Sequence, residues 1–180
     1  MKILKWSVII IVLIAIIGFL GFYFMRSQTK KASPEDTVEY KAKDLKLSVF
    51  YCRPYKKDRE IFGELVPYGE VWRTGANEAT TFTTNKDIVF GEDSLAAGTY
   101  TLWTIPQKTQ WTIILNSKLY GWGVQWGGKA SREEKYDVLK INVPVIELEQ
   151  TVEQFTIDFE YNVNLTMKWD KTKVSVPIRF

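Results

Sequence analysis

The side chains best suited to chemistry gather between Tyr51 and Thr81, where charged, aromatic and turn-forming residues are interleaved. The candidate site residues in this stretch are Arg53, Arg59, Trp72, Arg73, Asn77 and Glu78. Arginine and glutamate form bidentate ion pairs, and asparagine caps turns. One interpretation is therefore structural, with Arg73 paired to Glu78 and Trp72 in the core. The other is a ligand site, because aromatic walls with guanidinium and carboxylate groups suit a small polar molecule or a glycan.

A carboxylate-dependent hydrolase acting on a glycan is the catalytic alternative. Glycosidases need two carboxyl groups at a set separation, and Glu78 has two candidate partners in the same stretch, Glu70 and Asp58. A sequence does not give that separation. We therefore assign no catalytic residue and favour a binding module over an enzyme.

A second candidate stretch, YGWGVQWGG from Tyr120 to Gly128, alternates glycine with large rings. Glycine gives such a loop backbone freedom, and exposed Trp122 and Trp126 would stack on sugar rings or contact an apolar partner. The alternative is that both rings fold back on the edge of a sheet. The stretch lacks the G-K-[ST] signature of a phosphate-binding loop.

Missing residue types exclude several kinds of site. The chain has no histidine and one cysteine, Cys52. Ser-His-Asp and Cys-His catalysis, histidine metal sites and intrachain disulfides are therefore excluded, and we expect no metal and no cofactor. Cys52 occupies an alternating position in a predicted strand, which favours a small core residue over a nucleophile.

The elements that must position these residues are mostly strands. Alternation of apolar and polar residues predicts strands at 46–52, 79–84, 88–90, 99–105, 110–116, 139–143, 155–159, 165–169 and 174–178, with one short helix at 61–66. Period-2 alternation means that each strand buries one face and leaves the other in water. Eight or nine such strands predict an all-β fold, an antiparallel β-sandwich.

A separate apolar segment precedes this domain. Trp6 to Met25 is a run of 20 residues without a charge, which as a helix spans roughly 30 Å, the hydrocarbon thickness of a bilayer. We expect a short basic flank at 1–5, a transmembrane helix at 6–25, a basic juxtamembrane segment and linker at 26–45, and the β-sandwich at 46–180. A cleaved signal peptide is the alternative, although the run is long for one and ends in bulky aromatics without a small-x-small site.

Charge is distributed unevenly along the chain. The net charge is +3, yet residues 1–31 carry five basic side chains and no acid, so the remainder has 19 basic and 21 acidic residues. Anionic lipid headgroups attract the basic segment, whereas the domain lacks the basic surface that nucleic acid requires. Basic residues flank both ends of the apolar run, so the positive-inside rule does not fix orientation. We expect the domain on the extracytoplasmic (periplasmic) side, by analogy with signal anchors.

Several blocks resemble one bacterial family. IFGELVPYGEVWRTGANEATTFT, LAAGTYTLWTIP, WTIILN, DVLKINV and FTIDFE resemble the family of domain of unknown function 2911 over about residues 46–180. Its signature falls on Arg53, Pro54, Gly63, Val66, Pro67, Tyr68, Gly69, Trp72, Arg73, Gly75, Asn77, Glu78 and Thr80. The resemblance implies an exported or membrane-attached single domain and brings no catalytic role. Similar sequences carry a small hydroxyl residue where Cys52 stands, which argues further against thiol chemistry.

The sequence thus predicts a single-pass membrane protein of the cell envelope whose sandwich is a ligand-binding or interaction module. Its expected partners are the bilayer, through residues 6–25, and a glycan or small polar ligand. A glycan hydrolase and a purely structural envelope component are the alternatives.

Overall fold

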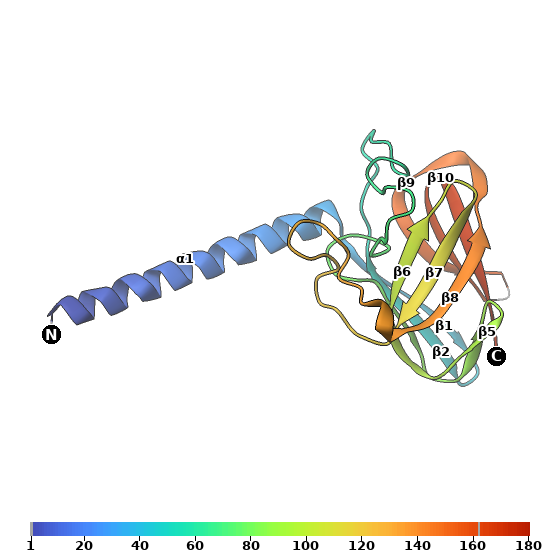
Figure 1. The fold of residues 1–180 in the computed structure, drawn as a ribbon, viewed down its shortest axis with the longest axis horizontal. Coiled ribbons are helices and arrows are strands. Elements are labelled where there is room, and N and C mark those ends of the chain that lie inside the picture. Colours follow the sequence, from blue (N-terminus) through green and yellow to red (C-terminus); the bar gives the residue numbers. More distant parts are fainter. Residues whose placement is uncertain (1, 162) are drawn as a thin grey trace. The chain divides into compact units, whose positions relative to one another are not determined.

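A computed structural model describes residues 2–161 and 163–180, which form two compact units. The first ends at Ala32, and the second runs from Ser33 to Phe180 (Figure 1). The first is a single helix, α1 (Lys2–Ala32). It ends just before Ser33-Pro34, because the residue before a proline disfavours the helical conformation.

Helix α1 is long and apolar enough, by length and composition, to cross a membrane. Within its candidate span, Lys5–Ala32, the apolar 18-residue window has no buried residue among those that the structure describes. Ile11, Ile14, Ile17 and Phe19 are among the exposed apolar side chains of the helix. An exposed apolar helix of this length matches either a membrane anchor or a signal sequence.

The second unit consists of two antiparallel sheets that lie face to face (Figure 1). The larger sheet has the order β1 (Glu35–Ala42), β2 (Leu45–Cys52), β3 (Thr81–Thr84), β6 (Gly98–Pro106), β7 (Gln110–Asn116) and β8 (Asp137–Pro144). The smaller has the order β5 (Asp93–Leu95), β4 (Ile88–Phe90), β10 (Asn164–Arg179) and β9 (Ile146–Glu160). A 3₁₀ turn, η1 (Glu134–Tyr136), precedes β8. The predicted antiparallel sandwich behind an apolar helix is confirmed.

The core lies between the two sheets and follows the predicted alternation. In β2, Leu45, Leu47, Val49 and Tyr51 are all buried, and they face side chains of the smaller sheet. The Tyr51 hydroxyl accepts a hydrogen bond from the amide of Ile157 at 3.0 Å, which ties the two sheets together. Burial raises the pKa of Tyr51 to about 12, because the phenolate would lose its hydration.

The structure differs from the predicted elements at the start of the domain. Residues 26–45, expected to be a linker, instead contain the end of α1 and the strand β1, which pairs with β2 along its whole length. Only Val38 and Tyr40 of this strand pack against the core. The charged residues around these two hide the period-2 signal, which is why the strand was missed.

Two further elements differ. The predicted strands at 165–169 and 174–178 are one long strand, β10, whose pairing with β9 shifts register on both sides of Asp170. Asp170 pairs with Val152 and has a φ of 53°, and the extra residues at both register shifts lie on β9, so the alternation along β10 changes phase here. The helix predicted at 61–66 is wrong, because this segment is a set of turns with a bridge between Phe62 and Val66.

The larger sheet is buried on both faces near its centre. Trp103 and Ile114 point away from the main core, yet both have 0 % exposure. Val71, Ala79, Ile105, Tyr120 and Ala130 complete this second apolar cluster. The expectation of one wet face per strand is therefore wrong here, because the irregular segments at 71–79 and 120–130 cover the outer face.

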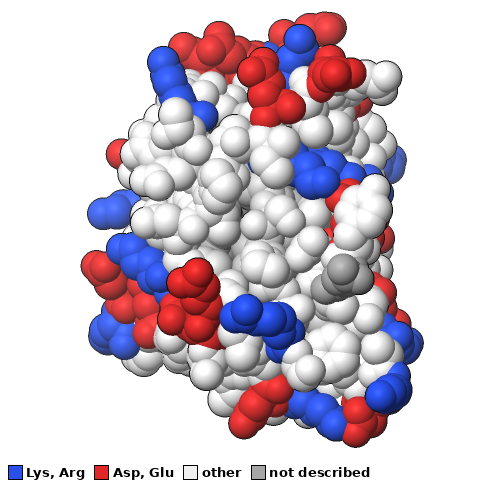
Figure 2. Space-filling view, turned by 90° about the vertical axis from the view of Figure 1, so that its right-hand side faces the viewer, with Lys and Arg blue, Asp and Glu red and all other residues white. Residues whose placement is uncertain are grey.

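The surface of the domain carries charges of both signs. On the face drawn in Figure 2, basic and acidic side chains lie mainly toward the two ends, and a broad area between them is uncharged. Several charges are neutralised in ion pairs, as where Lys168 and Lys173 both contact Glu160. That face therefore presents no extended field of one sign.

Candidate functional site

Residues 53–80, between β2 and β3, contain most of the candidate residues, and Trp72 anchors this segment in the sandwich. The Trp72 amide donates to the Thr104 carbonyl at 2.7 Å, and its indole Nε1 donates to the Gly75 carbonyl at 3.0 Å. The ring stacks on Trp169 at 6.0 Å and meets Phe155 edge-on at 5.0 Å. The Trp72 ring thus packs among the aromatic side chains of the core.

Arg53 and Arg59 use their guanidinium groups within the fold. Arg53 forms an ion pair with Asp36 at 3.0 Å and donates to the Phe155 carbonyl and the Thr156 hydroxyl, so it joins β1 and β2 to β9. Arg59 donates to the carbonyls of Lys56 and Tyr55 in its own turn. Neither side chain is directed at the other candidates.

A tight turn places Asn77 and Glu78 over the end of β2. Thr74, Gly75 and Asn77 all have positive φ, at 55°, 146° and 58°. Gly75 is required here, because a Cβ at this position would lie 2.8 Å from the Cys52 carbonyl oxygen. Asparagine is among the few other residues that tolerate the left-handed region. The turn thereby brings Glu78 next to Cys52.

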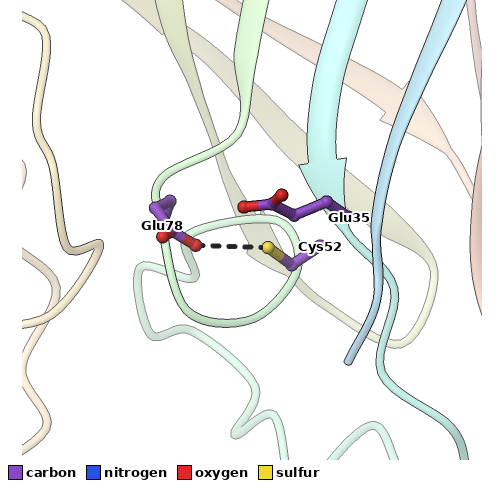
Figure 3. A group of neighbouring side chains, drawn as sticks. All are labelled: Glu35, Cys52 and Glu78. Atoms are coloured by element: carbon purple, nitrogen blue, oxygen red, sulfur yellow. Dashed lines mark hydrogen bonds between the residues drawn. The ribbon is translucent and has the colours of Figure 1, made fainter. Parts of the chain in front are cut away.

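Cys52, Glu78 and Glu35 form a compact cluster (Figure 3). The buried Cys52 thiol donates to Glu78 Oε2 at 3.3 Å. Glu35, the first residue of β1, pairs with Cys52 across the sheet. Their ligand atoms, Sγ and one carboxylate oxygen from each glutamate, lie within 4.8 Å of one another. These three side chains therefore converge at the end of the sheet where the domain begins.

Arg73 lies close to this cluster in a partly desolvated position. Its Nε is fully buried and makes no hydrogen bond within the described structure. Burial lowers the pKa of Arg73, and attraction to Cys52 and Glu78 partly offsets that effect. Gly123 covers the side chain so closely that a Cβ there would stand 2.5 Å from Arg73 Cδ. Arg73 is thus held between the cluster and the glycine-rich loop.

The loop between β7 and β8, residues 117–136, completes this end of the domain. Trp122 forms a backbone bridge with Glu78, and the Gly123 amide donates to the Asn77 carbonyl at 3.0 Å. A second bridge between Val124 and Ala130 closes a small turn with Trp126 at its tip. The exposed fractions are 43 % for Trp122 and 105 % for Trp126. The structure therefore brings Arg73, Asn77, Glu78 and Trp122 together, with Trp126 projecting beyond them.

Three residues of this arrangement were missed or discounted from sequence. Glu35 was placed in a linker, Cys52 was assigned to the core, and Gly123 was treated only as a source of flexibility. The signal for Glu35 would have been its register opposite Cys52, which depends on knowing that β1 and β2 pair. Nothing in the sequence indicates that Gly123 lies against Arg73, because their contact joins distant segments.

The cluster offers ligand atoms for a metal ion, but its surroundings are unfavourable for one. A thiolate and two carboxylates can ligate zinc, although structural zinc sites usually have four nitrogen or sulfur ligands. Arg73 already attracts both Cys52 and Glu78 electrostatically, and its positive charge opposes a metal ion beside it. The arrangement is better suited to hydrogen bonding with a polar group than to metal chemistry.

The comparisons with known proteins identify a family for the second unit only. A family described as "Protein of unknown function (DUF2911)" matches residues 33–178, which nearly coincide with the compact unit from Ser33 to Phe180. Among curated proteins and among solved structures, nothing matches the chain. The sequence resemblance is confirmed, and its matched region begins at the end of the apolar helix.

Proposed function

We propose that this chain, which belongs to the DUF2911 family, is a membrane-anchored interaction module of the cell envelope, with its sandwich on the extracytoplasmic side. The observation that carries the proposal is α1. Its uncharged run from Trp6 to Met25 matches the bilayer's hydrocarbon thickness, and its large apolar side chains that the structure describes are exposed. Lipid is the solvent that suits such a helix.

An uncleaved anchor is supported over a cleaved signal sequence by the end of the apolar run. Phe22, Tyr23 and Phe24 precede Met25 and Arg26, where a signal peptide would have small residues. Aromatic residues at this boundary suit the membrane–water interface. The helix also continues through basic residues to Ala32, so the basic segment is held close to the bilayer surface.

The interaction end of the module is the one built from Arg73, Asn77, Glu78 and the loop with Trp122 and Trp126. Support comes from the convergence of a guanidinium, a carboxylate and exposed rings at one end of the sandwich. Such a combination suits a polar envelope ligand, including a glycan. Arg53 and Trp72 hold the segment that carries these residues on the sandwich, whereas Arg59 donates within its own turn.

Fractionation and topology test this proposal. The full-length chain should remain in the membrane pellet after washing with alkaline carbonate, and it should have the mass of the uncleaved chain. A periplasm-active phosphatase fused after Phe180 should be active. A soluble product at the shortened mass would show that α1 is a signal sequence, and an inactive fusion with an intact anchor would reverse the orientation.

A hydrolase is the second candidate, and one observation favours it. Glu35 and Glu78 have carboxylate oxygens within 4.8 Å of each other, close to the separation of about 5–5.5 Å between the carboxyl groups of retaining glycosidases. Neither Glu70 nor Asp58 belongs to this group. Glu78 also accepts the Cys52 thiol, which gives it a structural role independent of catalysis.

A further inference from the structure

We propose that the loop carrying Trp122 and Trp126 docks on the surface of the same bilayer that holds α1, with Trp126 in the headgroup layer. This inference rests on the proposed anchor and names the partner of the exposed loop. It follows from three features of the domain, which are the side chains of the loop, its rigidity and its connection to the point where the chain enters the sandwich.

The loop exposes three large apolar side chains close together in sequence. The exposed fraction is 59 % for Leu119, 43 % for Trp122 and 105 % for Trp126. Tryptophan is the residue most typical of the membrane interface, because its ring is apolar and its N–H is polar. Between Lys118 and Arg132 the loop contains Lys129 and no acid, which suits anionic headgroups.

Trp126 is held in its exposed position by the backbone of the loop. The Gln125 amide donates to the Lys129 carbonyl at 2.8 Å, and the Gly128 amide donates to the Gln125 carbonyl at 3.0 Å. Gly127 and Gly128 have φ of 98° and 87°, which makes the turn possible after Trp126. The ring therefore does not fold back on the sheet, and the loop presents it at low entropic cost.

A short series of contacts links this loop to the beginning of the domain. Glu35, two residues after Ser33, pairs with Cys52. The Cys52 thiol donates to Glu78, and Glu78 forms a backbone bridge with Trp122. The side-chain amide of Asn77 also donates to the Ser33 carbonyl at 3.5 Å. The Trp loop and the entry point of the chain thus lie at the same end of the sandwich.

The distances involved allow the loop to reach lipid. The seven residues from Arg26 to Ala32 rise about 10 Å as a helix beyond the apolar run. Trp126 lies three residues beyond Gly123, a reach of at most about 10 Å. The polar layer of one leaflet is itself roughly 5–8 Å thick. The stretch of chain between the apolar run and the domain is therefore short enough for a loop near Ser33 to contact the headgroups.

The test uses full-length chain in vesicles of phosphatidylcholine and phosphatidylglycerol whose acyl chains are brominated near the headgroup. The emission of Trp126 is obtained as the difference between the wild-type chain and Trp126→Phe, and that of Trp122 likewise from Trp122→Phe. Docking predicts that the Trp126 component is blue-shifted and loses most of its intensity to the bromine. Trp103 and Trp169, which are buried in the domain, should be unquenched, and Trp103→Phe and Trp169→Phe give the matched difference spectra.

Each other outcome overturns the inference, and co-sedimentation separates the causes. If the chain does not co-sediment with the vesicles, α1 does not anchor it, and both the proposed anchor and the docking are contradicted. If it co-sediments but Trp126 emits as in water and is not quenched, only the docking fails. If Trp126 emission responds to added peptidoglycan fragments and not to vesicles, the loop recognises a glycan rather than the bilayer.

Discussion

The Cys52 thiol donates a hydrogen bond to the Glu78 carboxylate across 3.3 Å, and this contact joins the end of β2 to the irregular segment that follows it. Cys52 is fully buried, whereas Glu78 is half-buried and bridges to Trp122 in the next loop. Glu78 therefore connects a core strand and the Arg73 side chain through its carboxylate, and the exposed tryptophan loop through its backbone. Its contribution to stability can be separated from any role in binding or catalysis.

Glu78→Gln should lower the free energy of unfolding by about 1–3 kcal/mol. The side-chain amide still accepts the hydrogen bond from the Cys52 thiol. The partly desolvated Arg73, however, loses a neighbouring negative charge. Thermal and urea unfolding of full-length chain in mild detergent measures the change. Glu70→Gln, an exposed site on the same segment, is the matched control and should change stability little.

The hydrolase hypothesis makes the opposite prediction for the same variant. Glu78→Gln would then keep the wild-type unfolding curve and abolish hydrolysis of an envelope glycan. An unchanged melting temperature would therefore contradict the structural role given to Glu78 here.

Trp72→Ala should cost about 3–5 kcal/mol, because it leaves a cavity among Trp169, Phe155 and Phe62 and removes the bond to the Gly75 carbonyl. Trp126→Ala, which removes a ring of the same size from a fully exposed position, should change stability by less than about 0.5 kcal/mol. Unfolding of the two variants under one set of conditions compares them directly. Equal effects would show that Trp72 does not anchor its segment.

Much of the sandwich was predictable because its strands carry a clear alternation. The pair of 99–105 with 110–116 became the β6–β7 hairpin, in which Trp111, Ile113 and Leu115 face the core. Ile114 lies on the opposite face and is also buried, because its cover comes from segments distant in sequence. Alternation indicates which residues of a strand share a face of the sheet. It does not indicate which loops cover the outer face.

The candidate site was predictable in part and for a similar reason. Arg73, Asn77 and Glu78 are close in sequence, so their proximity in space could be expected. Glu35 and Gly123 come from other segments, and only strand register and loop packing place them there. Trp72 was ambiguous in sequence, because a buried ring and a ligand-stacking ring have the same residue type.

Gly123→Ala should displace the glycine-rich loop from Arg73. A Cβ at this position would lie 2.5 Å from Arg73 Cδ and 2.7 Å from Arg73 Cβ, and overpacking of this kind typically costs about 1–3 kcal/mol. Cleavage by trypsin after Lys129 should become faster as the loop loosens. Gly121→Ala is the control, because a Cβ there has nothing within 4 Å. Similar cleavage rates for both variants would contradict the contact.

The ion pairs of Glu160 predict how stability depends on pH. Glu160 lies between Lys168 at 2.5 Å and Lys173 at 2.6 Å, and hydrogen bonds from both lysines lower the pKa of its carboxyl group below the ordinary value. A carboxyl group whose pKa is lower in the folded state stabilises the protein above its unfolded pKa, about 4.3, and loses that contribution as the pH falls through the folded value.

Glu160→Gln should therefore be less stable than wild type at pH 7, and the difference should shrink toward zero in acid. Urea unfolding of both chains from neutral to acidic pH measures it. Glu147→Gln, at an exposed position on the same strand, is the control and should change stability little. If the difference in the free energy of unfolding between Glu160→Gln and wild type stayed constant across this pH range, the two lysines would not act through the charge of Glu160.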